Sequence, residues 1–172
     1  FVVQVDNDNP IRRDGSRYYC LLVSYEAHFQ DTAGTLRPQL KVELICRPPM
    51  IPSEMQSLGY MLEVLSGSAN PFVFSMNCIT VAETLAEKVL SLLRRCAWNW
   101  DGHQSGDFDT ALVRHVYDVW RIATNHSEAL EPAARVFSSS VNKDVLEFGG
   151  QHPEFAADPF GVLQRTLKVA ET

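Results

Sequence analysis

The stretch Thr80-Val81-Ala82-Glu83-Thr84-Leu85-Ala86-Glu87-Lys88 decides the second half of the fold, because strand-like sequence gives way to helix here. Thr80 with Glu83 three residues later has the pattern of a capping box, which predicts that a helix begins at this point. At 100° per residue, one apolar stripe of this helix contains Lys88 together with Val81, Leu85, Val89 and Leu92. The sequence therefore predicts a capped helix that carries a lysine on its apolar side.

Two interpretations of Lys88 are open. Its four-carbon stem can cover apolar surface while the ammonium group reaches water, which is common for lysine. Alternatively, the ammonium group is held in a cleft where it meets phosphate. The position of Lys88 on the helix does not by itself separate these interpretations.

The two halves of the chain differ in their predicted secondary structure, which indicates an α+β fold. Residues 1–78 read as strand-rich, with strands at 18–25, 40–46 and 72–78 and a short helix across Met55, Leu58 and Leu62 that Ser53 would cap. From residue 80 the pattern predicts helices near 80–97, 109–125, 128–137, 141–147 and 159–170. We therefore expect a sheet domain over residues 1–78 and a helical domain over residues 79–172.

Composition limits the classes of function. The chain has 172 residues, 45% hydrophobic content and a net charge of -6, which disfavours a broad DNA-coating surface but allows a local basic cleft. No long apolar run and no signal peptide occur, so neither a membrane span nor a membrane partner is expected. Four cysteines without zinc spacing read as buried thiols, which indicates a reducing cytoplasm.

The segment Lys41-Val42-Glu43 places two charges on one face of a predicted strand. A carboxylate such as Glu43 is a natural ligand for Mg²⁺, which takes one or two carboxylates plus phosphate oxygens. The alternative is a solvated strand face with a charge pair, because antiparallel sheets commonly keep one face wet.

Asp118 lies in the helix predicted from Asp109. It falls beside the apolar stripe, next to His115 and Ile122, and the stripe itself contains Leu112, Val116, Val119 and Ala123, widened by Val113 and Trp120. The pattern alone favours a surface carboxylate.

The sequence resembles the AbiEii-type nucleotidyltransferase toxins in its helical half. The residues that carry the resemblance are the "AEK" helix Ile79 to Arg95, with Ala86-Glu87-Lys88, and then Arg114-His115-Val116-Tyr117-Asp118-Val119-Trp120, in place of the family's "R-D-x-x-D-L" motif. The upstream Lys41-Val42-Glu43 is similar to the last sheet carboxylate of that family.

This resemblance implies a polymerase-β-like nucleotidyltransferase sheet followed by a helical bundle, with an NTP and Mg²⁺ as cofactors. It implies that Lys88 binds phosphate, that Asp118 is an acidic catalytic residue, and that Glu43 lies near the metal. Lys41 and Arg114 would help to bind the nucleotide. The implied partners are the NTP, a tRNA-like RNA or a protein as acceptor, and an antitoxin protein.

Two departures from the family pattern shape the expectation. The first is His115, which stands where the family usually has Asp. The second is that the family's first motif, a Gly-Ser or Gly-Gly-Thr turn followed by Asp-x-Asp, is missing. Asp6-Asn7-Asp8 has a similar composition but reads as a hairpin turn. The chain begins with Phe1, so we expect a C-terminal portion that is inactive alone. The alternative is a non-catalytic module that binds an antitoxin or another protein.

The histidines give no metal pattern in sequence. His28, His103, His115, His126 and His152 are scattered, and no two of them have the spacing of a helical metal site. The histidines therefore predict no metal site; a Cys–His nucleophile stays open as an alternative, because its partners would be neighbours in space, although nothing in the sequence marks a cysteine as activated.

Overall fold

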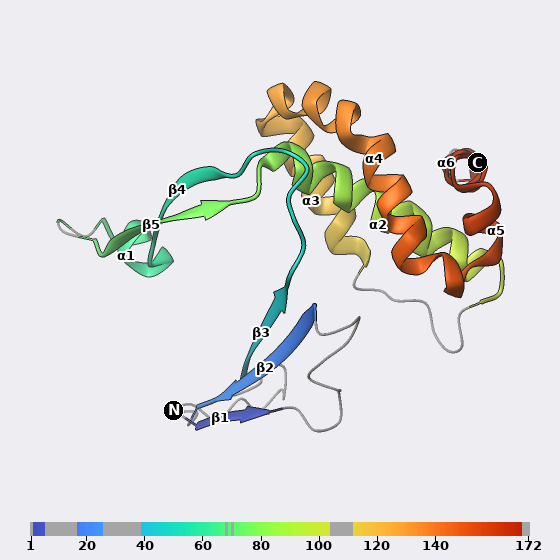
Figure 1. Ribbon diagram of the computed structural model, residues 1–172. Coiled ribbons are helices and arrows are strands. Elements are labelled where there is room, and N and C mark those ends of the chain that lie inside the picture. The colour runs from blue at the N-terminus through green and yellow to red at the C-terminus, as the bar shows by residue number, and fades with distance from the viewer. Residues whose placement is uncertain are drawn as a thin grey trace. The chain divides into compact units, whose positions relative to one another are not determined.

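The computed structural model describes residues 2–5, 17–25, 39–67, 69, 71–103 and 112–169. The chain divides into two compact units, Phe1–Pro48 and Pro49–Thr172, and each is described by itself. Antiparallel strands, interrupted by one short helix, come first and the longer helices follow, as labelled in Figure 1, so the α+β class is confirmed. The functional division between residues 78 and 79 stays a prediction.

The first unit contains an antiparallel sheet of three strands in the order β1-β2-β3. Its strands are β1 (Val2–Val5), β2 (Tyr18–Ser24) and β3 (Gln39–Ile45). The register places Cys20 opposite Glu43 and Leu22 opposite Lys41. The strands predicted at 18–25 and 40–46 are thus confirmed, whereas Asp6-Asn7-Asp8 lies outside the described residues.

The second unit begins with a two-stranded antiparallel pair. It consists of β4 (Glu54–Gly59) and β5 (Val73–Cys78), with the short helix α1 (Met61–Leu65) between them. The short helix predicted across Met55 and Leu58 is therefore wrong. Residues 54–59 form a strand because they pair with β5, which satisfies their backbone hydrogen bonds. Short helical spacing in the sequence does not reveal such pairing, since β propensity depends on context.

Helix α2 (Val81–Trp100) begins as predicted, because Thr80 is its N-cap and accepts a hydrogen bond from the backbone nitrogen of Glu83 at 3.1 Å. In a capping box, the carboxylate of Glu83 would bond the backbone nitrogen of Thr80. Here its partners are different. It accepts hydrogen bonds from the backbone nitrogens of Met50 and Ile51 at 2.9 to 3.0 Å. Glu83 is 2% exposed, so it fixes the segment before β4 against the start of α2.

The remaining helices follow α2 along the chain. They are α3 (Val113–Asn125), η2 (Ser127–Ala129), α4 (Leu130–Phe148), η3 (Gly149–Gln151), α5 (Pro153–Ala157) and α6 (Pro159–Val169). One continuous α4 replaces the two helices predicted at 128–137 and 141–147. Serines reduce helix propensity at that point, but Ser140 bonds the carbonyl of Val136 within the helix and Val141 is fully buried, so packing holds the helix together.

Helix α2 is the centre of the helical part and packs against α3, α4 and α6 (Figure 1). Its first half joins one apolar cluster, consisting of Ala82, Leu85, Ala86, Ala129 and Ala133. Its second half joins another, consisting of Leu90, Leu93, Ala97, Val141, Phe155, Val162 and Leu163. Two consecutive cores therefore lie along one helix.

Two composition-based expectations can be compared with the structure. All four cysteines are free, but only Cys20 is buried and Cys46 is exposed, so the prediction of four buried thiols is wrong. Cys46 directly follows the end of β3, where the chain leaves the sheet. In the described part of the chain, no helix combines the length and the hydropathy of a membrane span.

Candidate active site

Lys88 lies on α2 near the boundary between its two apolar clusters. The predicted stripe is partly wrong, because Val81 is 37% exposed and Leu92 is half-buried, while Leu90 and Leu93 are buried. The helix packs against three others, so its buried face is broader than a single stripe and is rotated from the predicted one. Lys88 therefore lies at the edge of the buried face, with its side chain 32% exposed.

Asp118 on α3 is the partner of Lys88. The Nζ atom of Lys88 donates a hydrogen bond to Oδ2 of Asp118 at 2.7 Å, and the aspartate side chain is 39% exposed. Val119 and Ile122 of the same helix pack on the first apolar cluster, whereas Val116, predicted on the buried stripe, is 52% exposed. The inward face of α3 is thus turned so that Asp118 meets α2, and this partly exposed carboxylate forms an interhelical ion pair.

The ion pair changes the acid–base chemistry of Asp118. The hydrogen bond from Lys88 is the main cause that lowers the pKa of the Asp118 carboxyl; partial burial opposes it, and the charges of Lys88, His115 and Arg114 each add a smaller lowering effect. The carboxyl is therefore ionised throughout the neutral range.

Lys88 keeps hydrogen-bonding capacity beyond Asp118. An ammonium group has three donors, and the bond to Asp118 occupies one of them. Since the side chain is also partly exposed, the geometry leaves room for an anionic oxygen on the same nitrogen.

Glu43 forms a separate polar group on the sheet of the first unit. Its carboxylate accepts a hydrogen bond from Oη of Tyr18 and pairs with Nζ of Lys41 at 3.1 Å. The hydrogen bond to Glu43 is the main reason that the pKa of Tyr18 rises to about 12, since ionised tyrosine could no longer donate it. The predicted charge pair on one strand face is thus present.

The donor set at Glu43 fits a hard cation only in part. Mg²⁺ takes carboxylate and phosphate oxygens, and Glu43 offers one carboxylate that is about half exposed. Lys41 competes for the same oxygen. Glu43 alone therefore offers at most one carboxylate to such an ion.

Arg114 and His115 precede Asp118 by four and three residues on α3. Arg114 is exposed and His115 is half-buried. The positive charges of both residues lower the pKa of Asp118. Because His115 takes the place of the family's Asp, α3 has no second carboxylate at that position.

The predicted residues fall into the two compact units. Lys41 and Glu43 belong to the first unit, and Lys88, Arg114 and Asp118 belong to the second. Within the second unit the structure brings Lys88 and Asp118 into direct contact.

A hollow in the helical part lies well away from Lys88. It is lined by Ala97, Trp100, Asp101, Arg165 and Val169. Asp101 follows Lys88 by thirteen positions along α2, which is about 20 Å of helix.

Sequence reasoning missed one polar cluster, which consists of His103, His152 and Glu154 and is called the histidine cluster below. About fifty residues separate its two histidines in the chain, so no local spacing reveals it. A partial signal is present in His152-Pro153-Glu154, where two ligand-type side chains flank the proline that opens α5.

The protein is thus an α+β protein in which Lys88 of α2 and Asp118 of α3 form an ion pair between two adjacent helices. The chain matches the family described as the nucleotidyl transferase AbiEii toxin, type IV toxin–antitoxin system, over residues 1–168. It therefore belongs to this nucleotidyltransferase toxin family, and the resemblance predicted from the sequence is confirmed. No curated protein and no solved structure matches the chain.

Proposed function

We propose that this chain takes part in transferring a nucleotide from an NTP to an RNA acceptor, with the end of a tRNA as the first candidate and a protein acceptor as the second. The single observation that supports this most is the ion pair of Lys88 with Asp118, on the two helices that carry the family resemblance. The reaction would take place in the cytoplasm, where tRNA and NTP are available.

Lys88 would bind the triphosphate. Nucleotide transfer depends mainly on positioning and on neutralising the charge of the phosphates. Asp118 holds the ammonium group in one direction while two of its donors stay available for phosphate oxygens. Because the pKa of Asp118 is lowered, this carboxylate is a weak base, and we propose that it positions Lys88 rather than accepting the proton of the attacking hydroxyl.

Three further residues have proposed roles, each within its own compact unit. Arg114, exposed one helical turn before Asp118, would contact the nucleotide, and Lys41 would do so from β3. Glu43 would provide one carboxylate to Mg²⁺. The ion, when bound, neutralises phosphate charge; Tyr18 keeps the Glu43 carboxylate oriented by donating its hydroxyl hydrogen.

The test is a transfer assay with labelled NTPs and total tRNA. It is run on residues 1–172 and on the same chain with any residues that its gene encodes before Phe1. Since the 172 residues carry no recognisable first motif, we expect transfer only when that motif is supplied. Transfer that does not change in Lys88→Ala would contradict the proposal.

The second candidate is a non-catalytic module that binds an antitoxin. The observation that favours it is His115, which stands where the family usually has a carboxylate. This candidate predicts capture of the antitoxin together with no heat of NTP binding in calorimetry. Heat of NTP binding that Lys88→Ala abolishes would rule it out.

A further inference from the structure

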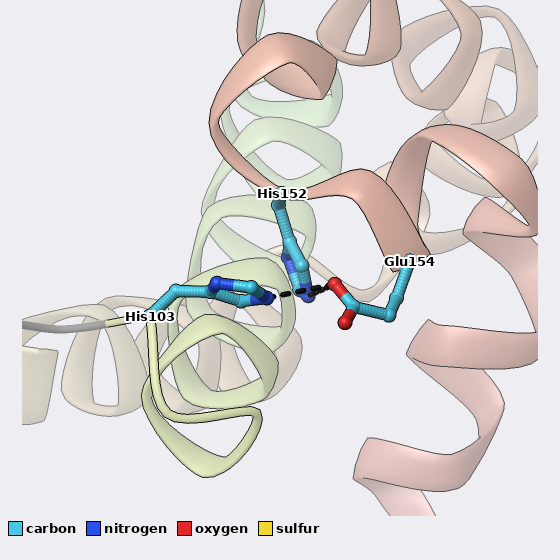
Figure 2. A group of neighbouring side chains, drawn as sticks. All are labelled: His103, His152 and Glu154. Carbon is cyan, nitrogen blue, oxygen red and sulfur yellow. Dashed lines mark hydrogen bonds and ion pairs between the residues drawn. The ribbon is translucent and has the colours of Figure 1, made fainter.

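The histidine cluster lies where the end of α2 meets α5. In Figure 2 the side chains of His103, His152 and Glu154 converge, and one ligand-type atom of each lies within 4.8 Å of the other two. Nε2 of His103 is 2.7 Å from Oε2 of Glu154, and Nε2 of His152 is 3.7 Å from the same oxygen. We propose that these three side chains bind one Zn²⁺ ion, which ties the end of α2 to the start of α5.

The backbone on the α2 side of the cluster is rigidly defined. Gly102 has φ +78°, and its nitrogen bonds the carbonyl of Asn99 while the nitrogen of His103 bonds the carbonyl of Trp98. These two bonds form a Schellman motif, the common end of a helix. His103 is therefore held at a fixed position directly after α2.

The α5 side is fixed as well. His152 is the N-cap residue of α5, Pro153 occupies the first helical position and Glu154 lies in the first turn. The nitrogen of Ala156 bonds the carbonyl of His152 at 3.0 Å. Two of the three ligands thus come from one short helical turn, so binding requires little ordering of the chain.

The chemistry of the three donors selects a transition metal. Two imidazoles and a carboxylate are a common zinc ligand set that leaves a fourth position for water, whereas Mg²⁺ and Ca²⁺ prefer oxygen ligands. Ligands of a tetrahedral zinc ion lie about 3.3 Å apart, given bonds of about 2.0 to 2.1 Å. The two measured separations of 2.7 and 3.7 Å bracket this value.

The charges around the cluster also suit a divalent cation. Asp101 lies 2.9 Å from Nε2 of His152, and both of its oxygens accept hydrogen bonds from Arg165 at 2.8 Å. Zn²⁺ on Nε2 of His152 would replace the contact of that nitrogen with Asp101, and the Asp101 carboxylate would keep its hydrogen bonds from Arg165. The sum of Asp101, Glu154 and Arg165 is one negative charge, so the cation would not be left uncompensated.

His152 is the most buried of the three proposed ligands, and its packing fixes the position of the site. His152 is 2% exposed, its ring stacks on Phe155 at 6.0 Å, and the ring of His103 meets it edge-on at 5.1 Å. Phe155 belongs to the second apolar cluster. A metal ion at His152 would consequently stabilise the packing of α2, α5 and α6, because an ion that binds only the folded state raises its stability by mass action.

The experiment titrates the chelator-treated chain with Zn²⁺ in a calorimeter and with Co²⁺ in a spectrophotometer. We test His103→Ala and Glu154→Gln, because both side chains are partly exposed and their loss leaves the buried His152 in place. The matched controls are His126→Ala and Glu128→Gln, which remove another histidine–glutamate pair, 3.1 Å apart and exposed.

We expect one Zn²⁺ per chain in the unsubstituted protein and in both controls, with affinity at least about 10-fold lower in His103→Ala and Glu154→Gln. Co²⁺ should give the absorption of a tetrahedral site, and Zn²⁺ should raise the unfolding temperature only when His103 is present. No binding to the folded protein would overturn the proposal. Binding that persists in both cluster variants would also overturn it, since free cysteines such as Cys46 would then be the ligands.

Discussion

Nζ of Lys88 and Oδ2 of Asp118 lie 2.7 Å apart and join α2 to α3, although thirty residues separate them in the chain. Both side chains remain about one third exposed. A pair at this depth contributes little stability on its own, because solvent screens it and ordering two side chains costs entropy. The ion pair instead fixes the orientation of the Lys88 ammonium group at the surface between α2 and α3.

The first prediction concerns the pKa of Asp118. Lys88→Met removes the hydrogen bond that lowers this pKa most, so the pKa should rise toward the ordinary value of 3.8. The folded-state pKa is depressed, so the contribution of the pair to stability is present above the ordinary value and is lost as pH falls through the depressed one. An NMR pH titration of the Asp118 carboxyl measures the shift, and Lys168→Met, on exposed α6 surface, should leave it unchanged.

The second prediction concerns Tyr18 and Glu43. Tyr18 should ionise near pH 12, and Glu43→Gln should bring its pKa down toward 10, because the negative partner is removed. The folded-state pKa is raised, so the stabilisation from this bond is complete below pH 10 and is lost as pH rises through about 12. Ultraviolet titration of tyrosinate reads this directly, with Tyr60→Phe as the control.

Mg²⁺ extends the Tyr18 measurement into a test of Glu43 as a metal ligand. A cation on the Glu43 carboxylate would weaken its hold on the phenol hydrogen and lower the pKa of Tyr18. A Tyr18 titration that is identical with and without Mg²⁺ and NTP would argue against Glu43 as a ligand.

The third prediction concerns the start of α2. Thr80→Ala should lower the free energy of unfolding by about 1 kcal/mol, because the N-cap bond to Glu83 is lost. Glu83→Ala should cost more, about 2 kcal/mol or above, since the backbone nitrogens of Met50 and Ile51 lose their acceptor. Urea unfolding measures both, and Thr124→Ala on α3 should change little. Equal costs for the three variants would contradict this account of the helix start.

The fourth prediction concerns the buried ion pair between α2 and α4. Nε of Arg94 lies 2.6 Å from Oδ2 of Asp144, both side chains are about 15% exposed or less, and the guanidinium group lies 4.1 Å from the ring centre of Phe148. Burial lowers the pKa of Arg94 and Asp144 opposes this. Asp144→Ala should destabilise the fold by about 3 to 5 kcal/mol, because it leaves a buried charge without its partner.

The combined substitution Arg94→Met with Asp144→Leu should cost less than Asp144→Ala alone, since no buried charge remains. Thermal unfolding of the single and double variants compares them. A double variant less stable than Asp144→Ala would show that packing of Arg94 against Phe148 matters more than the charge pair.

The sequence predicted local features better than contacts. The cap at Thr80 and the strands that became β2, β3 and β5 follow from short patterns. Lys88 could be singled out by its place on the apolar side of its helix, whereas Asp118 could be selected only by the family resemblance. The contact between these two could not be predicted, because it depends on how α2 and α3 pack. Tertiary packing also explains two errors in the predicted secondary structure, β4 in place of a helix and the single long α4.

The histidine cluster was missed for the same reason. His103 ends one helix and His152 precedes another, and only the packing of α2 against α4 and α6 brings them together. A pattern search that requires close spacing finds neither residue.

The central claim is that Lys88 binds the triphosphate of the nucleotide that is transferred. The most direct measurement is the rate of label transfer from NTP to tRNA by the active toxin with Lys88→Ala, compared with Lys168→Ala as the matched control. The account predicts a rate about 10²-fold lower for Lys88→Ala, as for loss of one charge-stabilising donor, and an unchanged rate for the control. Equal rates for both variants would contradict it.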